Sequence, residues 1–441
     1  MEFSRFGMKF AGQTGILSLM DDMGKAMESL AAPAATPGGA QAEPVCMLGG
    51  GNPAHIPEIN AIWRRRMAEV LAEGSEFERM LANYDTPQGK SEYLEALANL
   101  LRHQYGWEID GRNIAITNGS QSAFFYLFNL FAGRYRDGSV RRVLFPIVPE
   151  YIGYADQSVH HEDFVARRPL IAETGPHRFK YRVDFDKLGL DGKISAICTS
   201  RPTNPTGNVL TDDELRHLAR EARERDIPLI IDNAYGLPCP GIVFADAEPY
   251  WDPNVVLCMS LSKLGLPAAR TGIVIAQPRI IRALSAMNAI ASLANGSLGQ
   301  VLTLPMIKSG DILRLGRELI RPYYRTRSDQ AARWIDEALE PTGVDWSQHV
   351  SEGAIFLWIW FKNLPVSTEV LYERLKQRRV IVVPGKYFFF GDEDPSDWPG
   401  EISGWKHRDE CLRLSYAQDS QSVQRGIAIL GEEVAALMRQ A

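Results

Sequence analysis

The chain is organised around one apolar run and the polar residues that end it, Val255-Val256-Leu257-Cys258-Met259-Ser260-Leu261-Ser262-Lys263. The first five of these residues predict a buried β-strand. Two hydroxyls and a lysine follow where this strand ends, and Arg270 comes a short loop later. A lysine in an apolar cleft loses hydration, which favours its neutral amine, and a neutral amine can attack a carbonyl to form a Schiff base. An isolated Ser-x-Ser-Lys segment suits an exposed loop better, so the interpretation depends on the rest of the chain.

The residues around Lys263 suit a phosphate as well as a Schiff base. The hydroxyls of Ser260 and Ser262 can bind phosphate oxygens, and the guanidinium of Arg270 offers a planar fork of donors. A Schiff-base lysine beside a phosphate site indicates pyridoxal phosphate, which is an aldehyde that carries a phosphate group. We therefore expect Lys263 to bind this cofactor covalently.

Three more apolar runs predict strands that end in polar or aromatic residues, namely Val143–Phe145, Ile194–Ile197 and Leu229–Ile231. Short buried runs of this kind that alternate with helices favour a sheet covered on both faces. Ligands of such sheets bind beyond the carboxyl ends of the strands, so the side chains that follow the runs are expected to converge with Lys263. These side chains are Tyr151, Asn204, Asp232 and Tyr235. Taken singly, Asp232 could cap a helix and Asn204 could belong to a plain turn.

A second part of the phosphate site is predicted in the segment Asn118-Gly119-Ser120-Gln121. It lies between a predicted strand, Ile114–Thr117, and a predicted helix, Ser122–Phe131. The free N–H groups and the dipole at a helix N-terminus attract anions, although a plain serine cap would have the same sequence. The three glycines Gly49–Gly51 would let the backbone approach a ligand, but they do not form the Gly-x-Gly-x-x-Gly pattern of dinucleotide-binding proteins.

The composition argues against several classes of protein. A net charge of -6 argues against a nucleic-acid-binding surface, and the longest apolar run, Ala354–Phe361, is too short to span a bilayer. The five cysteines form no Cys-x-x-Cys pair and the histidines form no His-Glu-x-x-His motif, so we expect neither disulfides nor a metal site. No basic region followed by an apolar core stands at the N-terminus, so we expect no signal peptide and a cytoplasmic protein.

The length of 441 residues predicts two domains. We assign residues 1–60 to an N-terminal arm and part of a small domain, with a flexible insert rich in Ala, Pro and Gly at 31–44. Residues 61–318 are predicted to form the large cofactor-binding domain, and residues 319–441 the C-terminal small domain. In the latter, Arg413 lies between apolar neighbours of a predicted strand. A buried arginine needs a partner, which is either a structural ion pair or a substrate carboxylate.

Together these motifs resemble the fold-type I aminotransferases, the aspartate aminotransferase superfamily. The motifs that carry the resemblance are, in order, Asn204-Pro205-Thr206-Gly207, Asp232-x-x-Tyr235, Ser260-x-Ser262-Lys263 with Arg270, and Arg413. Four longer stretches resemble the branch of this family that transfers amino groups between valine and pyruvate. These stretches are Met47–Ala54, Asn118–Phe131, Pro149–Asp156 and Ser200–Asn208. The resemblance implies an α/β fold with a three-layer α/β/α large domain and a smaller α/β domain.

The resemblance also implies roles for the candidate residues. Lys263, Asp232 and Tyr235 would be catalytic. The cofactor would be bound within one subunit by Ser120, Gln121, Tyr151, Asn204, Asp232, Tyr235, Ser260, Ser262, Lys263 and Arg270. Tyr84 would reach the phosphate of the other subunit, which implies a homodimer with shared active sites. The substrate carboxylate would bind Arg413, with Asn204 and the backbone of Gly50 and Gly51 beside it.

The implied activity is a transamination in two half-reactions, in which Lys263 moves the α-proton as general base and acid. Valine and pyruvate would give 2-oxoisovalerate and alanine, and the apolar N-terminal arm (Phe3, Phe6, Phe10, Ile16) would close over the aliphatic side chain. Another aliphatic or broad-specificity aminotransferase, or a pyridoxal-phosphate-dependent lyase, could use the same ring pocket. A regulator that binds DNA is disfavoured because residues 1–50 contain few basic residues. A catalytically silent scaffold would lack the imine at Lys263.

Overall fold

The computed structural model describes residues 44–160, 163–391 and 402–440, together with residues 2–4, 7, 8, 17, 20, 21, 24 and 25. Residues 31–43 of the predicted insert lie outside the described residues, as do Phe6, Phe10 and Ile16 of the predicted arm. Of the arm's apolar side chains, Phe3 and Leu17 are described and both are exposed. The closure of this arm over a substrate therefore stays a prediction.

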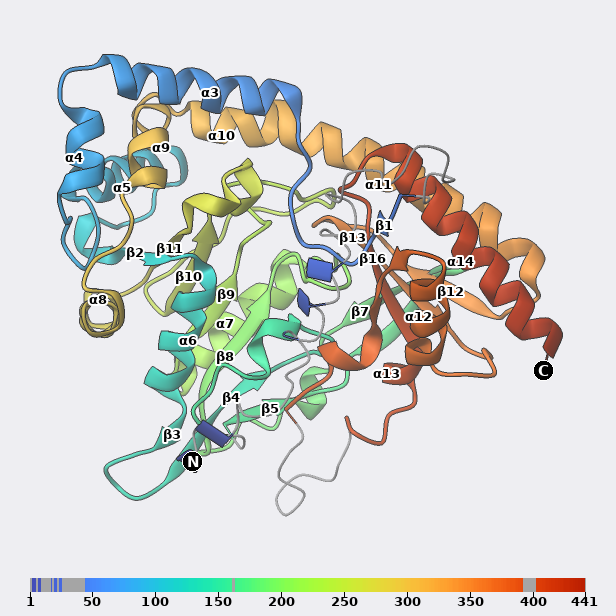
Figure 1. Cartoon of the computed structure of the whole chain (residues 1–441). Helices are drawn as coiled ribbons and strands as arrows, with labels where there is room; N and C mark the ends of the chain where they lie inside the picture. The colour runs from blue at the N-terminus through green and yellow to red at the C-terminus, as the bar shows by residue number, and fades with distance from the viewer. Residues whose placement is uncertain are drawn as a thin grey trace.

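An eight-stranded sheet forms the centre of the large domain (Figure 1). Its order is β2-β11-β10-β9-β8-β4-β3, and β5 pairs with β4. The bounds are β2 (Ile114–Asn118), β11 (Thr271–Ile275), β10 (Val255–Ser260), β9 (Leu229–Asp232), β8 (Ile194–Ser200), β4 (Val140–Phe145), β3 (Gly133–Arg134) and β5 (Phe164–Ala166). Strands β10, β9, β8 and β4 are parallel, whereas β11 is antiparallel to both of its neighbours. The carboxyl ends of the parallel strands therefore meet at one edge, as the apolar runs predict.

Helices cover both faces of this sheet, which confirms the predicted three layers. Alternate residues of each strand contribute to one of two apolar clusters, because successive side chains of a strand point to opposite faces. One cluster includes α6 (Ser120–Phe131) and α8 (Pro278–Ser292). The other includes α5 (Ser91–Tyr105), α7 (Asp212–Glu224) and α9 (Leu298–Ser309). A capping box begins α7, with Thr211 and Glu214 satisfying each other's backbone N–H groups.

The small domain contains a six-stranded sheet in the order β15-β16-β13-β12-β7-β6. Its strands are β15 (Val383–Pro384), β16 (Cys411–Ser415), β13 (Phe356–Phe361), β12 (Trp346–His349), β7 (Arg178–Arg182) and β6 (Leu170–Gly175). The predicted long helix Arg321–Leu339 is present as α11, and it lies beside the C-terminal helix α14 (Ser420–Gln440) (Figure 1). Further helices include α10 (Asp311–Leu315), α12 (Thr368–Gln377) and α13 (His407–Glu410).

The sheet pairing bears on the predicted domain limits at two places, and it crosses a limit only at the first. The hairpin β6–β7 comes from residues 170–182 but pairs with β12, so part of the segment 61–318 belongs to the sheet of the small domain. At the other limit, β1 (Cys46–Met47) pairs with β14 (Val380–Ile381), which places residues before 60 against the small domain. The predicted single strand Val380–Val383 is split between β14 and β15. The exact domain limits stay a prediction.

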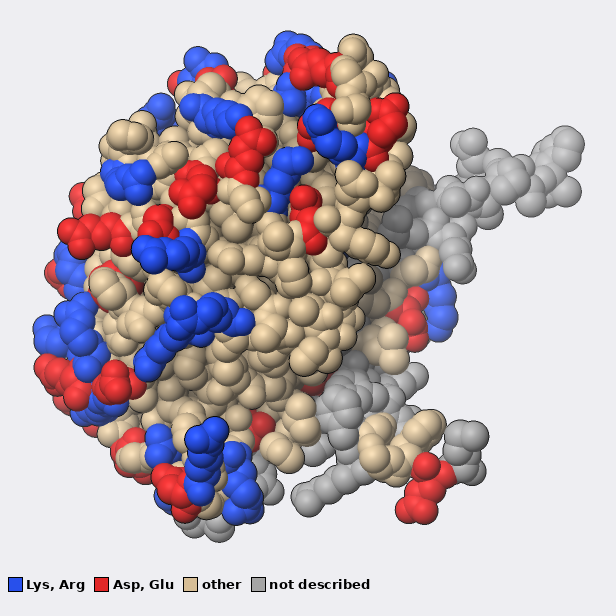
Figure 2. Space-filling view, turned by 90° about the vertical axis from the view of Figure 1, so that its left-hand side faces the viewer, with Lys and Arg blue, Asp and Glu red and all other residues tan. Residues whose placement is uncertain are grey.

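The remaining helices of the large domain, α3 (Pro57–Ala72) and α4 (Glu76–Ala82), lie at its outer side (Figure 1). Figure 2 shows this side, on which acidic and basic side chains are interspersed around a broad area without charged residues. Within the part of the chain that the structure describes, no helix is long and apolar enough to cross a membrane.

Candidate active site

The carboxyl ends of the parallel strands open into a cavity of about 750 Å³, which includes the part open to solvent. The cavity brings together most of the residues predicted from the sequence. Its lining consists of Gly51, Ser120, Gln121, Tyr151, Ser200, Pro202, Asn204, Asp232, Ala234, Tyr235, Ser260, Ser262, Lys263 and Arg270.

Lys263 lies on the 3₁₀ turn η4 (Ser262–Leu264) that follows β10. Its Nζ donates a hydrogen bond to the carbonyl oxygen of Gly51, 2.6 Å away, and lies 5.1 Å from the centre of the Tyr235 ring. Loss of hydration and the charge of Arg413 lower the pKa of Lys263 to about 8, against the opposing charge of Asp232. The amine is therefore much easier to deprotonate than an exposed lysine, as the Schiff-base interpretation requires.

Asp232 ends β9 and faces the same cavity. The hydroxyl of Tyr154 donates a hydrogen bond to its Oδ2, and the backbone N–H of Ala234 donates to Oδ1 over 2.9 Å. Burial raises the pKa of Asp232, whereas both hydrogen bonds and the charge of Lys263 act in the opposite direction. No helix begins at Asp232, so the alternative that it is a helix cap is wrong.

The predicted anion site forms where α6 begins. Gly119 precedes the helix with a φ of 80°, and a Cβ at this position would lie 2.1 Å from Nη2 of Arg270. Glycine is thus needed both for the backbone conformation and for the approach of the guanidinium. The Oγ of Ser260 accepts from the Ser262 N–H over 3.1 Å and donates to its Oγ over 3.0 Å. Helix N–H groups, hydroxyls and Arg270 therefore face one end of the cavity.

Tyr151 also lines the cavity, just before the turn η2 (Ile152–Tyr154). Its ring packs edge-to-face against Tyr154, with ring centres 5.3 Å apart. A Cβ on Gly153 would lie 2.3 Å from this ring, so the glycine permits the tyrosine to fold over its own turn. An aromatic face is thereby presented to a planar ligand, as predicted.

Arg413 of β16, in the small domain, is 3% exposed and contacts the cavity through Asn204, which is one of its lining residues. Its Nη1 donates to Oδ1 of Asn204 over 2.8 Å and its Nη2 to the carbonyl oxygen of Gly49 over 2.5 Å. The rings of Phe356 and Phe388 flank the guanidinium at 4.3 and 5.1 Å. Burial lowers the pKa of Arg413 to about 10, so it stays charged at neutral pH.

The partners of Arg413 decide between the two predicted roles. No carboxylate of the described residues forms an ion pair with it, and its buried Nε has no hydrogen-bond partner among them. A structural ion pair is therefore not what the structure shows. A charged, desolvated guanidinium with a spare donor is instead prepared for an anion from outside the chain.

Three predicted site residues do not line this cavity, namely Arg413, which contacts its lining residue Asn204, and Tyr84 and Gly50. Tyr84 is 82% exposed and lies outside the cavity of its own chain. Gly50 makes no contact that distinguishes it, because the carbonyl oxygens that bind Arg413 and Lys263 belong to Gly49 and Gly51. The glycine segment is thus placed correctly, but one of its two predicted residues is replaced by its neighbour.

Sequence reasoning assigned no role to several residues that the structure places at the site. Tyr154 holds Asp232, and Ser200, Pro202 and Ala234 line the cavity. The signal for Tyr154 was its spacing of three residues from Tyr151, which puts both rings on one helical turn. Ser200, Pro202 and Ala234 lie next to recognised motifs, but their residue types do not indicate a specific chemical role.

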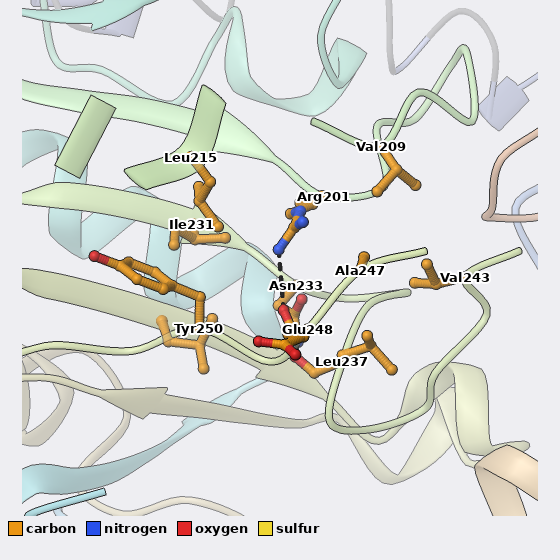
Figure 3. A pocket seen from close by; sticks show the side chains of 11 residues that line it. Arg201, Val209, Leu215, Ile231, Asn233, Leu237, Val243, Ala247, Glu248 and Tyr250 are labelled. Carbon is orange, nitrogen blue, oxygen red and sulfur yellow. Dashed lines mark hydrogen bonds between the residues drawn. The ribbon is translucent and has the colours of Figure 1, made fainter. Parts of the chain in front are cut away.

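A separate cavity of about 290 Å³ lies beside β9 and α7 (Figure 3). It contains Arg201, whose guanidinium donates to the backbone oxygen of Glu248 over 3.1 Å, to the backbone oxygen of Leu210 over 2.8 Å, and to the carboxylate of Asp212. The donors of Arg201 are thus engaged within the chain. This arginine is a structural residue and does not supply a second carboxylate site.

Comparison with known proteins accounts for this arrangement. Residues 61–430 match the family "Aminotransferase class I and II". The chain therefore belongs to the class I and II aminotransferases, with the fold-type I architecture. It is 48% identical to the valine–pyruvate aminotransferase of Escherichia coli (strain K12), over 98% of each chain.

Solved structures show the same likeness. The crystal structure of a putative amino-acid aminotransferase from Psychrobacter arcticum 273-4 is 44% identical and superposes with a TM-score of 0.90 over 100% of both chains. That of the valine–pyruvate aminotransferase from Salmonella typhimurium LT2 is 46% identical, with a TM-score of 0.84 over 97% of this chain and 100% of that chain.

As a class I and II aminotransferase the protein uses pyridoxal phosphate, and the residues of the cavity fit this group. The amine of Lys263 has a lowered pKa, a buried carboxylate lies opposite the anion site, and Gly119 leaves room for Arg270 at the helix N-terminus. The aromatic wall of Tyr151 suits a flat ring. Amine, acid, aromatic face and anion site are the four features that such a cofactor requires.

Proposed function

We propose that this protein transfers the amino group between valine and pyruvate, giving 2-oxoisovalerate and alanine. The observation that carries the proposal is the near full-length identity of 48% to a valine–pyruvate aminotransferase. The cavity supports it independently, because Lys263 and Arg270 are the cations among its described lining residues and Arg413 stands at its edge. A substrate with one carboxylate is therefore matched in charge, whereas a second carboxylate would lack a partner.

Arg413 binds the substrate carboxylate in this proposal. Asn204 Oδ1 and Gly49 O hold two of its nitrogens, and Phe356 and Phe388 hold the plane of the guanidinium. Because this orientation exists before the substrate arrives, little conformational entropy is lost on binding. The side chain of Asn204 serves both the substrate arginine and the ring side of the cavity, where Tyr235 also lies.

Lys263 moves a proton at the substrate α-carbon. With a pKa of about 8, roughly a tenth of the amine is neutral at pH 7 in the free site, so it can act as a base and then return the proton as an acid. Its hydrogen bond to Gly51 keeps the amine near the glycine segment and Arg413. When bound, pyridoxal phosphate supplies an aldehyde that carries the amino group and a ring that withdraws electrons.

The remaining residues orient the cofactor and set its charge. Asp232 would hold a negative charge towards the ring nitrogen, and the hydrogen bond from Tyr154 keeps its carboxylate aligned. Tyr235 and Asn204 would donate to the ring oxygen, and Tyr151 would cover the ring face. The phosphate would be held by Ser120, Gln121, Ser260, Ser262 and Arg270. These roles follow from the proposed binding mode and from the positions of the side chains.

The test is a panel of amino donors and acceptors, using the purified full-length protein. Valine and 2-aminobutyrate with pyruvate as acceptor, and alanine with 2-oxoisovalerate as acceptor, should all react, with kcat/KM values that differ by about 1–3 kcal/mol for each methylene. Aspartate should be poor. Efficient transfer from aspartate would favour a dicarboxylate aminotransferase, and product without amino transfer would favour a lyase on the same fold.

We further propose that the protein is a homodimer with shared sites. Exposed apolar side chains come from elements that lie at the same outer side of the large domain, and they are Leu71, Leu81, Tyr84, Ile290 and Leu293. This side carries the uncharged area visible in Figure 2. Large exposed apolar areas mark interfaces, and Tyr84 would then extend from this side into the phosphate site of the partner.

A cytoplasmic location is supported by the five free thiols.

A further inference from the structure

Glu150 is a buried carboxyl that none of the proposed catalytic steps uses. It is 0% exposed and lies one residue before Tyr151. Its Oε1 accepts from the backbone N–H of Ser200 over 2.8 Å, and its Oε2 is 2.5 Å from Oγ of Ser200. The backbone N–H of Tyr151 lies 3.3 Å from Oε2. One carboxyl therefore joins the end of β8 to the segment that carries the aromatic wall.

Ser200 in turn lies beside the most acidic part of the site. It pairs with Asp232 in the parallel ladder of β8 and β9, and both residues line the cavity. Glu150 also makes a backbone contact: its N–H donates to the carbonyl oxygen of Phe388 over 3.0 Å. The ring of Phe388 flanks Arg413. Glu150 thus links three segments: Tyr151 with the turn that follows it, the end of β8 that pairs with Asp232, and the segment of Phe388, whose ring flanks Arg413.

We propose that Glu150 is a positioning residue that aligns these three segments as a neutral carboxylic acid. Oε1 accepts from the Ser200 N–H and Oε2 accepts from the Ser200 hydroxyl; in the neutral acid the second hydrogen bond would run the other way, from Oε2 to Oγ, while the first is unchanged. This role deepens the proposed aminotransferase function and rests on it for the kinetic part of its test.

The charges around Glu150 support its neutrality. The groups that interact with it are Asp232 of β9, the phenol of Tyr154 on η2 and the thiol of Cys198 on β8, and none of them is a cation. Burial raises the pKa of Glu150 to about 8 and the negative charge of Asp232 acts in the same direction, against the hydrogen bonds from Ser200 and Tyr151. A second carboxylate here would oppose the charge that Asp232 must hold towards the cofactor.

The first arm of the test measures stability of the full-length chain without cofactor. The folded protein keeps a proton on Glu150 up to a pKa of about 8, whereas an unfolded glutamate loses it near 4.5. Stability from this group is therefore full below pH 4.5 and is lost as pH rises to about 8. The unfolding midpoint of the wild type should fall relative to that of Glu150→Gln between pH 5 and 8. Parallel curves over pH 5–9 would overturn the neutral state.

The second arm uses the holoenzyme. Glu150→Ala should lower kcat by up to about 100-fold with little change in KM, because misplaced reacting groups affect the chemical step. It should also shift the absorbance of the bound cofactor. Glu150→Gln, which keeps the shape and the neutral charge, should recover most of kcat and the original absorbance. Equal losses in both variants, or wild-type kcat in Glu150→Ala, would overturn the proposal.

Two controls keep the result unambiguous. If Glu150→Ala does not fold, Ser200→Ala removes the contact at Oγ but leaves the backbone contact, and it should lower kcat in the same direction by a smaller factor. Unchanged kcat in that variant would count against positioning through Ser200. If valine proves not to be a substrate, the unfolding curves and the cofactor absorbance still decide the role of Glu150, so the two proposals fail separately.

Discussion

Tyr154 donates a hydrogen bond to Oδ2 of Asp232 and so fixes the carboxylate that faces the cofactor site. The two residues lie 78 positions apart in the chain and belong to different strand ends of one sheet. Burial favours the neutral acid of Asp232 and raises its pKa, whereas the hydrogen bond from the Tyr154 phenol stabilises the ionised form. The negative charge of Asp232 in this cavity thus depends on Tyr154, a residue to which the sequence motifs assign no role.

The Tyr154–Asp232 contact predicts a shift in the pH dependence of catalysis. Loss of the phenol in Tyr154→Phe removes a hydrogen bond that lowers the pKa of Asp232, so this pKa rises. Asp232 would then be protonated at higher pH. The acid limb of the plot of kcat/KM against pH should shift to higher pH, and the effect on kcat/KM should be smaller above neutral pH. A pH profile identical to that of the wild type would show that the hydrogen bond is not functional.

Replacement of Asp232 itself should have a larger effect. Asp232→Ala removes the negative charge that faces the ring nitrogen, so turnover should fall by orders of magnitude while the fold is retained. Steady-state kinetics and circular dichroism check the two parts. Asp345, which lies at the surface of the small domain, provides a control as Asp345→Ala. Turnover close to wild type in Asp232→Ala would mean that this carboxylate is only structural.

A covalent cofactor on Lys263 is a further expected outcome. The purified protein should absorb visible light, and reduction with borohydride should attach the cofactor permanently to Lys263. Peptide mapping by mass spectrometry identifies the modified residue. Lys263→Ala should lose both the adduct and the turnover, and an adduct on another lysine would contradict the assignment of the active site.

The exposed Tyr84 predicts complementation between subunits. Neither Tyr84→Phe nor Lys263→Ala homodimers should reach wild-type turnover, because each has a lesion in every site. In a mixed dimer one site carries both lesions and the other carries none. Activity should therefore appear on mixing, in proportion to the mixed dimer measured by native mass spectrometry. A mixture that exchanges subunits but stays inactive would place Tyr84 in the site of its own chain.

Arg413 should contribute equally to every amino donor, since each carries the same carboxylate. Loss of a desolvated, hydrogen-bonded charge pair costs roughly 2–5 kcal/mol, which is about 30- to 5,000-fold in kcat/KM. Arg413→Ala should show this loss for valine, alanine and 2-aminobutyrate alike. The exposed Arg220 offers a surface control as Arg220→Ala. A loss confined to one donor would mean that Arg413 reads the side chain instead.

The local pattern of the chain was enough to predict the strand ends and the chemistry they carry. Apolar runs define buried strands, and parallel strands bring their carboxyl ends to one edge, so Lys263, Asp232, Asn204 and Tyr235 could be placed together before any coordinates were known. The same reasoning missed the hairpin β6–β7 because β6 is mostly exposed and β7 alternates basic and aromatic residues, so neither strand is an apolar run. Their pairing depends on β12, which is far away in the chain.

Contacts between different strand ends were decided only in three dimensions. Arg413 meets Asn204 across 209 residues, and Glu150 meets Ser200 across 50, because the order of strands and the docking of the small domain place them side by side. No periodic pattern in the sequence predicts either contact. Each exists because a buried polar group must find a partner, and the partner is whichever group the folded chain brings within hydrogen-bond distance. Residue types and strand ends therefore follow from the sequence, whereas the pairs that orient the chemistry follow from the packing of the two domains.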